Sequence, residues 1–316
     1  MDQFIVSSSP HINSDESVAK IMRDVVIALI PAGIAGVFFF GIRSLFVITV
    51  AIIFAVLTEW AMQKLLKKPV TIDDWSAVVT GLLLAYNLPP TVPLWLVAVG
   101  SIIAIAIIKQ AFGGLGHNFM NPALGARAIM LASWGTHMTT WIAPKLDAIS
   151  SATPLEMLKE GSANIDIVSV WNAFIGNVGG SIGETSAIAL IIGGVYLLYR
   201  GVISWRIPIT YLGTFMILTW VLGPYGFFTG NGIYHLFTGG LMLGAFFMAT
   251  DYSSSPVTPM GQIIMGIGCG LFTTIIRLYG GYPEGVSYAI LIMNLATPII
   301  DKFTMPKVFG EVAEDV

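Results

Sequence analysis

A short polar stretch between long apolar runs holds the residues whose types and spacing best suit chemistry. Thr153 and Glu156 have the spacing of a capping box with proline at the first helical position, which predicts that Thr153 is a helix N-cap. The free amides and the positive end of such a helix would face any bound anion. The spacing fits two interpretations, a hydroxyl beside an anion site or a plain cap of a short surface helix. The whole stretch reads Asp147-Ala148-Ile149-Ser150-Ser151-Ala152-Thr153-Pro154-Leu155-Glu156.

The ionisable residues within apolar runs or at their ends include Glu59, Arg127, Glu184 and Asp251. A charged side chain inside the hydrocarbon layer of a membrane costs free energy. It therefore usually faces a bundle interior, a cavity or a partner. We expect Arg127 either to anchor a phosphate or to pair with Glu59 or Asp251. Glu59 falls one turn from the end of its run, which favours the membrane interface. Asp251 suits either a local cap or pair, or a position on an ion path.

A second capping box follows in Ser181-Ile182-Gly183-Glu184. The spacing predicts the start of the next apolar helix. It also offers Glu184 as part of the wall of a pocket beside Thr153. Both interpretations remain open at this point.

The sequence carries no pattern typical of a resident metal or nucleotide. His11, His117, His137 and His235 are scattered without metal-ligand spacing. No glycine-rich phosphate motif follows a strand. The single Cys269 lies in an apolar run, where we expect it to pack between helices. We expect no catalytic side chain, no metal ligand and no nucleic-acid partner.

Apolar helices must position these residues. The chain is 55% hydrophobic and 10% charged, with a mean hydropathy of +0.81, which excludes an ordinary soluble domain. Runs near the length that crosses about 30 Å of hydrocarbon recur along it. They predict an all-α polytopic membrane protein of about ten transmembrane helices, of which the third and fifth are short. The runs cover residues 25–40, 44–62, 76–88, 92–111, 121–134, 184–199, 207–222, 233–250, 262–278 and 285–300.

The basic residues predict an orientation. The first twenty residues lack the apolar core of a signal peptide, so we expect the N-terminus to stay in the cytoplasm. Ten runs then return the C-terminus there and leave Thr153 on the outer face. Lys and Arg residues gather on the inner side. Those facing inward are Lys20, Arg23, Lys64, Lys67, Lys68, Lys109, Arg200, Arg206, Lys302 and Lys307, against Arg43, Lys145, Lys159 and Arg277 outward.

The chain divides into two similar halves around the polar stretch. We predict a first five-helix repeat in residues 1–134, an outer loop in 135–183 and a second five-helix repeat in 184–316. Five helices is an odd number, so the repeats would be inverted in the membrane. Matching phrases are Val79-Thr80-Gly81-Leu82-Leu83-Leu84 with Phe237-Thr238-Gly239-Gly240-Leu241-Met242, Gly113-Gly114 with Gly280-Gly281, and Met120-Asn121 with Met293-Asn294.

Several phrases together resemble one family. Asp147, Ser150, Ser151, Ala152 and Thr153 resemble the flavinylation signal Asp-x-x-Ser/Thr-Gly-Ala-Thr, with Ser151 in place of glycine. Serine is small and suits turns, so we expect it to be tolerated. With the phrases that follow, the chain resembles the D subunits of the Rnf ion-translocating ferredoxin:NAD oxidoreductase, which are homologous to the B subunits of the sodium-translocating NADH:quinone reductase. The phrases are Ser8-Ser9-Pro10-His11-Ile12, Gly113-Gly114-Leu115-Gly116-His117-Asn118, Asn121-Pro122-Ala123, Gly179-Gly180-Ser181-Ile182-Gly183-Glu184-Thr185-Ser186 and Met248-Ala249-Thr250-Asp251.

The resemblance implies a membrane flavoprotein subunit that is incomplete as an enzyme by itself. It implies covalent FMN on Thr153 through a phosphoester, with Arg127 and Glu184 as candidate pocket residues, and a riboflavin bound noncovalently between helices. It implies as partners the other Rnf subunits, including a second covalent-FMN subunit, a flavin transferase, and the lipid of a bacterial inner membrane. The alternative is a channel or secondary transporter whose inverted repeats surround a small solute.

Overall fold

A computed structural model of the chain describes residues 16–142, 144, 155, 170–223, 226–281 and 285–306. The described chain is a bundle of helices. It also contains one antiparallel hairpin, whose strands β1 (Leu222–Gly223) and β2 (Gly226–Phe227) have two residues each. This confirms the predicted all-α class. Short helical turns connect the longer elements: η1 (Ile72–Asp74), α6 (Gly135–Met138) and α8 (Val170–Ile175).

The helices follow the predicted runs closely. The first five runs form α1 (Val18–Phe40), α2 (Ile42–Leu65), α3 (Ser76–Tyr86), α4 (Leu94–Ile102) with the π-helical η2 (Ile103–Gln110), and α5 (Pro122–Ser133). The last five form α9 (Ala187–Tyr199), α10 (Arg206–Val221), α11 (Gly232–Phe237) with α12 (Leu241–Leu243) and the π-helical η3 (Gly244–Met248), α13 (Pro259–Tyr279), and α14 (Val286–Thr304).

Four of these helices, α1, α2, α13 and α14, are long and apolar enough to cross a membrane on their own. The others are shorter, as expected for the third and fifth runs. Large apolar side chains cover the outside of the long helices, with Ile34 and Phe38 of α1 each 66% exposed. An apolar exterior on apolar helices is what a bilayer requires. The protein therefore spans the membrane several times.

The eighth run is broken, although the sequence predicted one continuous segment over 233–250. Helix α11 ends at Phe237, and α12 begins at Leu241. Gly239 between them has φ +72°, a left-handed conformation that ends a helix readily at glycine. The break leaves backbone groups away from any helix inside the bundle, as in the discontinuous helices of transporters.

The second capping box does not start a helix, so that prediction was wrong. Helix α9 begins at Ala187, after its N-cap Ser186. The preceding segment instead pairs with the chain that leaves α3. The Ile182 amide donates to Leu88 O at 3.1 Å, and the Gly183 amide donates to Tyr86 O at 3.0 Å. The segment therefore forms backbone hydrogen bonds inside the bundle instead of capping a helix.

Helix pairings are similar in the two halves of the chain. Helix α2 packs on α4 as α10 packs on α13, and the halves meet through α1 on α9 and α5 on α14. The two inverted five-helix repeats stay a prediction. One phrase match does not extend to the structure, because Asn121 caps α5 whereas Asn294 lies inside α14.

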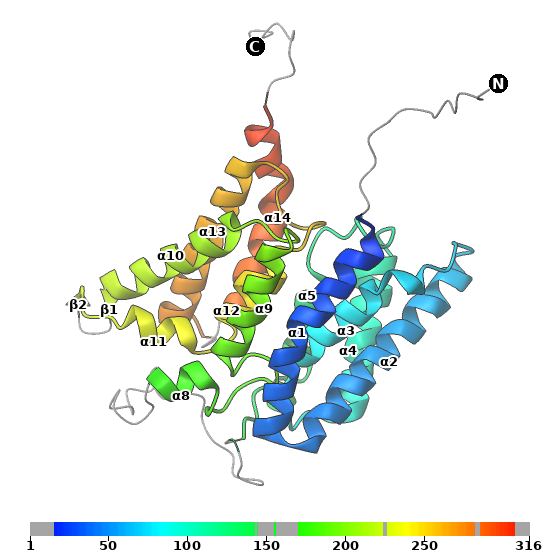
Figure 1. The fold of residues 1–316 in the computed structure, drawn as a ribbon, viewed down its shortest axis with the longest axis horizontal. Coiled ribbons are helices and arrows are strands. Elements are labelled where there is room, and N and C mark those ends of the chain that lie inside the picture. Colours follow the sequence, from blue (N-terminus) through cyan, green and yellow to red (C-terminus); the bar gives the residue numbers. More distant parts are fainter. Residues whose placement is uncertain are drawn as a thin grey trace, which may run out of the picture.

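Helix α1 begins and α14 ends at the same end of the bundle (Figure 1). Arg200 at the end of α9 reaches Asp24 of α1 there, with Nη2 at 3.0 Å from Oδ2. Lys68, just after α2, donates to Gly113 O at 3.0 Å. We call this the basic end.

Candidate functional site: a cavity between the halves

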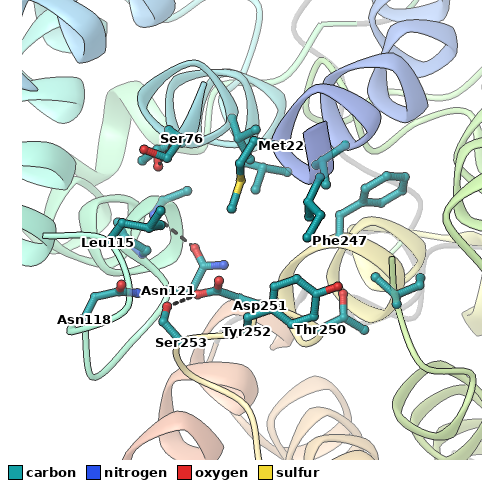
Figure 2. Close-up of a pocket in the computed structure, with 18 of the residues that line it drawn as sticks. Met22, Ser76, Leu115, Asn118, Asn121, Phe247, Thr250, Asp251, Tyr252 and Ser253 are labelled. Carbon is teal, nitrogen blue, oxygen red and sulfur yellow. Dashed lines mark hydrogen bonds between the residues drawn. The ribbon is translucent and has the colours of Figure 1, made fainter. Parts of the chain in front are cut away.

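A cavity opens between the two halves at the basic end. It holds about 730 Å³ of empty space, including the part open to solvent. Figure 2 shows Ser76 and Met22 on one side, with Asn121, Asp251 and Ser253 facing them across the space.

Both halves of the chain build the cavity. Helices α1 and α3 supply apolar wall residues such as Met22, Val79 and Leu83, while η3 supplies Phe246 and Phe247. The start of α5 and the turn after η3 form the polar side. Apolar walls with a few convergent polar groups are the usual composition of a ligand site.

Asn121 is fixed by its role as the N-cap of α5. Its Oδ1 accepts from the Ala123 and Leu124 amides at 3.0 and 3.2 Å, and Pro122 occupies the first turn. Its Nδ2 donates to Met248 O at 3.4 Å in the other half of the chain. An Asn-Pro sequence is well suited to this position because Asn caps and proline needs no hydrogen-bond partner there.

Three glycines shape the loop that brings Asn118 to the cavity. Gly113, Gly114 and Gly116 have φ of +130°, +105° and +86°, which strain any other residue. The loop then directs Asn118 Nδ2 to Met120 O at 3.0 Å and to Asp251 Oδ2 at 3.5 Å. The glycine-rich phrase thus serves to place an amide.

Asp251 is the carboxylate of the cavity wall, directly after the segment that ends in η3. Its Oδ2 accepts from Ser253 Oγ at 3.1 Å and from Ser254 Oγ at 2.9 Å. Burial raises its pKa, against the lowering effect of these hydrogen bonds. Of the two roles expected from sequence, the local pairing is observed.

Lys109 at the end of η2 supplies a cation to the opposite wall. Its Nζ lies 2.9 Å from Glu59 Oε1 and 3.0 Å from Oε2, and it donates to Ser76 Oγ at 2.6 Å. Glu59 also accepts from Gln110 Nε2 at 2.7 Å. Glu59 and Lys109 are each only 1% exposed. Glu59 is therefore buried inside the bundle, where a lysine of another span pairs with it.

Arg127 joins the halves at another place. Its Nη1 donates to Ser287 Oγ of α14 at 2.5 Å. The alternative partners expected from sequence are engaged elsewhere, Glu59 with Lys109 and Asp251 with its two serines. Arg127 therefore does not belong to the cavity wall.

The residues of the flavinylation signal, Asp147, Ser150, Ser151, Ala152 and Thr153, lie outside the described residues. Leu155 is described and buried. A Cβ on Gly239 would meet Leu155 Cδ1 at 2.8 Å and Arg277 Nη2 at 3.4 Å, and one on Gly240 would meet Glu184 Oε1 at 2.5 Å. Leu155, Arg277 and Glu184 therefore surround the break between α11 and α12.

Sequence reasoning missed the main polar groups of the cavity. The sequence singles out Asn118 and Asn121 only within the phrases that resemble the family. It singles out Lys109 only as one of the basic residues on the inner side. The signal that was available is the spacing of Glu59 and Lys109 on runs that both end at the basic side, but spacing does not reveal which helices touch.

Comparison with known proteins identifies the family. The sequence profile described as the NQR2, RnfD, RnfE family matches residues 5–310. The chain belongs to this family. Family membership covers nearly the whole chain and therefore includes both halves and the cavity between them.

Members with curated names are similar over their full length. The chain is 56% identical over 308 residues to the D subunit of the Na⁺-translocating ferredoxin:NAD⁺ oxidoreductase complex of Acetobacterium woodii, covering 96% of this chain and 95% of that one. It is 52% identical to the proton-translocating counterpart of Clostridium ljungdahlii, covering 97% and 96%. It is 36% identical to the D subunit of the ion-translocating oxidoreductase complex of Yersinia pseudotuberculosis, covering 96% and 98%.

Proposed function

We propose that this protein is a membrane subunit of an ion-translocating ferredoxin:NAD oxidoreductase and that it passes electrons through bound flavin. The observation that carries the proposal is similarity along nearly the whole chain to subunits named for that activity. The chain acts within a complex, because its described residues hold no group of three metal-ligating side chains and its sequence has no dinucleotide motif.

The covalent flavin of this proposal is FMN, joined through its phosphate to the Thr153 hydroxyl. The support is the attachment signal together with the polar surroundings of Leu155, two residues further on. Arg277 and Glu184 lie beside it at the break between α11 and α12, and a guanidinium is well suited to a phosphate. Arg127 and Glu184 were the expected pocket residues; of these, Glu184 is the one beside Leu155.

The noncovalent flavin of the proposal, riboflavin, fits the cavity at the basic end. A flavin ring has an apolar edge and an edge of alternating donors and acceptors. The cavity offers apolar walls from Val79, Leu83 and Phe247 opposite Asn118 and Asp251. When bound, such a flavin supplies electron transfer, while the side chains orient it and exclude water.

The proposed setting is a bacterial inner membrane with both termini in the cytoplasm. Basic residues near the ends of α1, α2, α9 and α14 at one end of the bundle support it. Thr153 then faces outward, where cytoplasmic NADH does not reach it. The flavin therefore needs neighbours as donor and acceptor. We propose the other Rnf subunits, including a second covalent-FMN subunit, with a flavin transferase for maturation and lipid around the bundle.

Ion movement in the complex is coupled to this electron transfer, and we place Glu59, Arg127 and Asp251 as candidates on the route. Glu59 and Arg127 are buried in α2 and α5 of the first half, and Asp251 lies in the turn after η3 in the second half. The sequence does not fix the cation, since two similarly close relatives are named for sodium and for protons. The break at Gly239 supplies backbone carbonyls that also suit a cation.

A channel or secondary transporter with a solute in the cavity is the second candidate. The cavity between the halves favours it, because transporters bind their cargo at such an interface. The two functions differ in flavin content. The band of this chain in a denaturing gel fluoresces under ultraviolet light if FMN is covalently attached, and stays dark in a transporter.

The decisive test uses the whole complex reconstituted in vesicles, with ion uptake followed during ferredoxin oxidation. Thr153→Ala is expected to stop electron flow. Glu59→Gln, Arg127→Ala and Asp251→Asn are expected to lower ion uptake per electron. Unchanged uptake per electron in all three would assign these residues a structural role and move the route to a neighbouring subunit. Purification of this chain as a monomer that oxidises ferredoxin and reduces NAD alone would contradict the proposal.

A further inference from the structure

Lys109 takes part both in the wall of the cavity and in a buried ion pair. Its side chain lines the cavity, and its ammonium lies within 3.0 Å of both Glu59 carboxylate oxygens. Glu59 does not line the cavity. A ligand in the cavity therefore meets the positive member of the pair first, with the negative member behind it.

The ammonium is held in place from several sides. Ser76 Oγ accepts from Lys109 Nζ and donates to Asp74 Oδ1, at 2.6 and 2.5 Å. Gln110 Nε2 donates to Glu59 Oε1 at 2.7 Å and so fixes the carboxylate. Fixed charges in a site that excludes water act more strongly than mobile charges at a surface.

Among the described residues that line the cavity, Lys109 carries the only positive charge and Asp251 the only carboxyl group. Asp251 is on the opposite wall, where three side chains donate to it. The charge of the Lys109 wall is therefore the local feature that distinguishes an electron-rich ligand from an electron-poor one.

We propose that Lys109 sets the reduction potential of the flavin bound in the cavity, with Glu59 as the counter-charge that moderates it. This inference rests on the proposed noncovalent flavin. Reduction adds an electron, delivered by another carrier of the complex, and places negative charge on the ring. The Lys109 side chain favours that charge. Glu59 opposes the charge more weakly because it lies further from the cavity.

The physical signature is a pair of opposite shifts. Loss of the positive charge lowers the potential, and loss of the negative charge raises it. Loss of both leaves a neutral wall, so the two shifts largely cancel. Structural damage has no such sign, so opposite shifts in the two single variants identify the electrostatic effect.

The experiment is a spectroelectrochemical titration of the whole complex carrying Thr153→Ala, which removes the proposed covalent flavin of this chain. We compare Lys109→Gln, Glu59→Gln and the double variant in that background. Lys109→Gln is expected to shift the reduced-to-oxidised ratio at fixed potential by about tenfold or more toward the oxidised form, which is about 59 mV for a one-electron couple. Glu59→Gln is expected to shift it toward the reduced form, and the double variant to lie between them.

The matched control is Lys68→Gln. Lys68 also lies at the basic end and donates to the cavity loop at Gly113 O, but it is exposed and screened by solvent. It is expected to leave the potential unchanged. Acid extraction measures the noncovalent flavin in each variant before titration.

The outcomes separate the inference from the function on which it rests. If the unmodified complex releases no noncovalent flavin from this chain, the proposed noncovalent flavin and the proposed role of Lys109 both fail. If flavin is present and Lys109→Gln and Glu59→Gln leave its potential unchanged, or shift it in one direction, the inference fails and the proposed function stands. Lys109→Gln leaves Glu59 buried without its cation, and this can prevent assembly. If Lys109→Gln does not assemble, the test compares Glu59→Gln with the double variant. Of these two, only Glu59→Gln is expected to raise the reduction potential of the flavin.

Discussion

The Gly183 amide donates to the Tyr86 carbonyl oxygen at 3.0 Å, and the Gly183 Cα faces the Tyr86 ring. A Cβ on Gly183 would overlap Tyr86 Cγ. The ring itself is fixed, because its hydroxyl donates to Leu29 O at 2.7 Å. This contact locks the segment before α9 against the chain that leaves α3, in the centre of the bundle.

Gly183→Ala is therefore expected to destabilise the protein by about 1–3 kcal/mol, the usual cost of overpacking. Thermal unfolding of the detergent-solubilised protein measures the loss. The matched control is Gly213→Ala in α10, where a Cβ meets nothing within 4 Å and helix propensity favours alanine by up to about 1 kcal/mol. Equal melting temperatures for the two variants would contradict the packing described.

Asn121→Ala is expected to lower stability by about 1 kcal/mol, because two α5 amides lose their acceptor. It is also expected to reduce the noncovalent flavin, since the change removes an amide from the cavity wall. Asn121→Ser keeps a side-chain acceptor for the cap but lacks the amide donor to Met248 O. Its stability should stay near that of the parent while its flavin content falls, which separates the two roles of the residue. Thermal unfolding and acid extraction measure them.

Asp251→Asn tests the buried carboxyl through pH. Burial raises the pKa of Asp251 above its ordinary value of 3.8. Between the ordinary and the raised pKa the folded state holds a proton that the unfolded chain has released, so the free energy of unfolding falls as pH rises through this window. The variant lacks this dependence. Melting temperatures measured across the window should fall more steeply in the parent than in the variant, and parallel curves would contradict the prediction.

Thr153→Ala is expected to abolish the covalent flavin, which the peptide mass and in-gel fluorescence detect. Ser151→Gly restores the residue usual in the attachment signal and is expected to leave the FMN content unchanged, because serine also suits a turn. Protein made together with its flavin transferase but carrying an unmodified Thr153 would refute the assignment.

The positions of the helices were predictable because hydrophobic runs determine them. Helices α2, α10 and α14 begin or end within a few residues of the predicted runs. The break in the eighth run was not predicted, because Gly239 and Gly240 occur in a pattern that is equally common inside membrane helices. The capping box at Ser181 failed for a similar reason, since a local signal competed with backbone pairing to a segment far earlier in the chain, at Tyr86 and Leu88.

The candidate site was less predictable than the fold. Thr153 is predicted from its spacing and the family signal, both of which are local, and it lies outside the described residues. The Lys109–Glu59 pair was not predicted, because it depends on which two spans touch, and a sequence contains no direct measure of that. Asp251 was found as a buried acid, but its serine partners became evident only in the folded turn.

The two π-helical segments restrict changes in chain length more than changes in side chain. Both η2 and η3 continue a short α-helix and end at the cavity, one from each half. A π-helical turn contains more residues than an α-helical one. Deletion of one residue from η2 would narrow this wide turn to α-helical bonding and so change the shape of the cavity wall. Single-residue deletions here are therefore expected to alter the cavity even where substitutions are accepted.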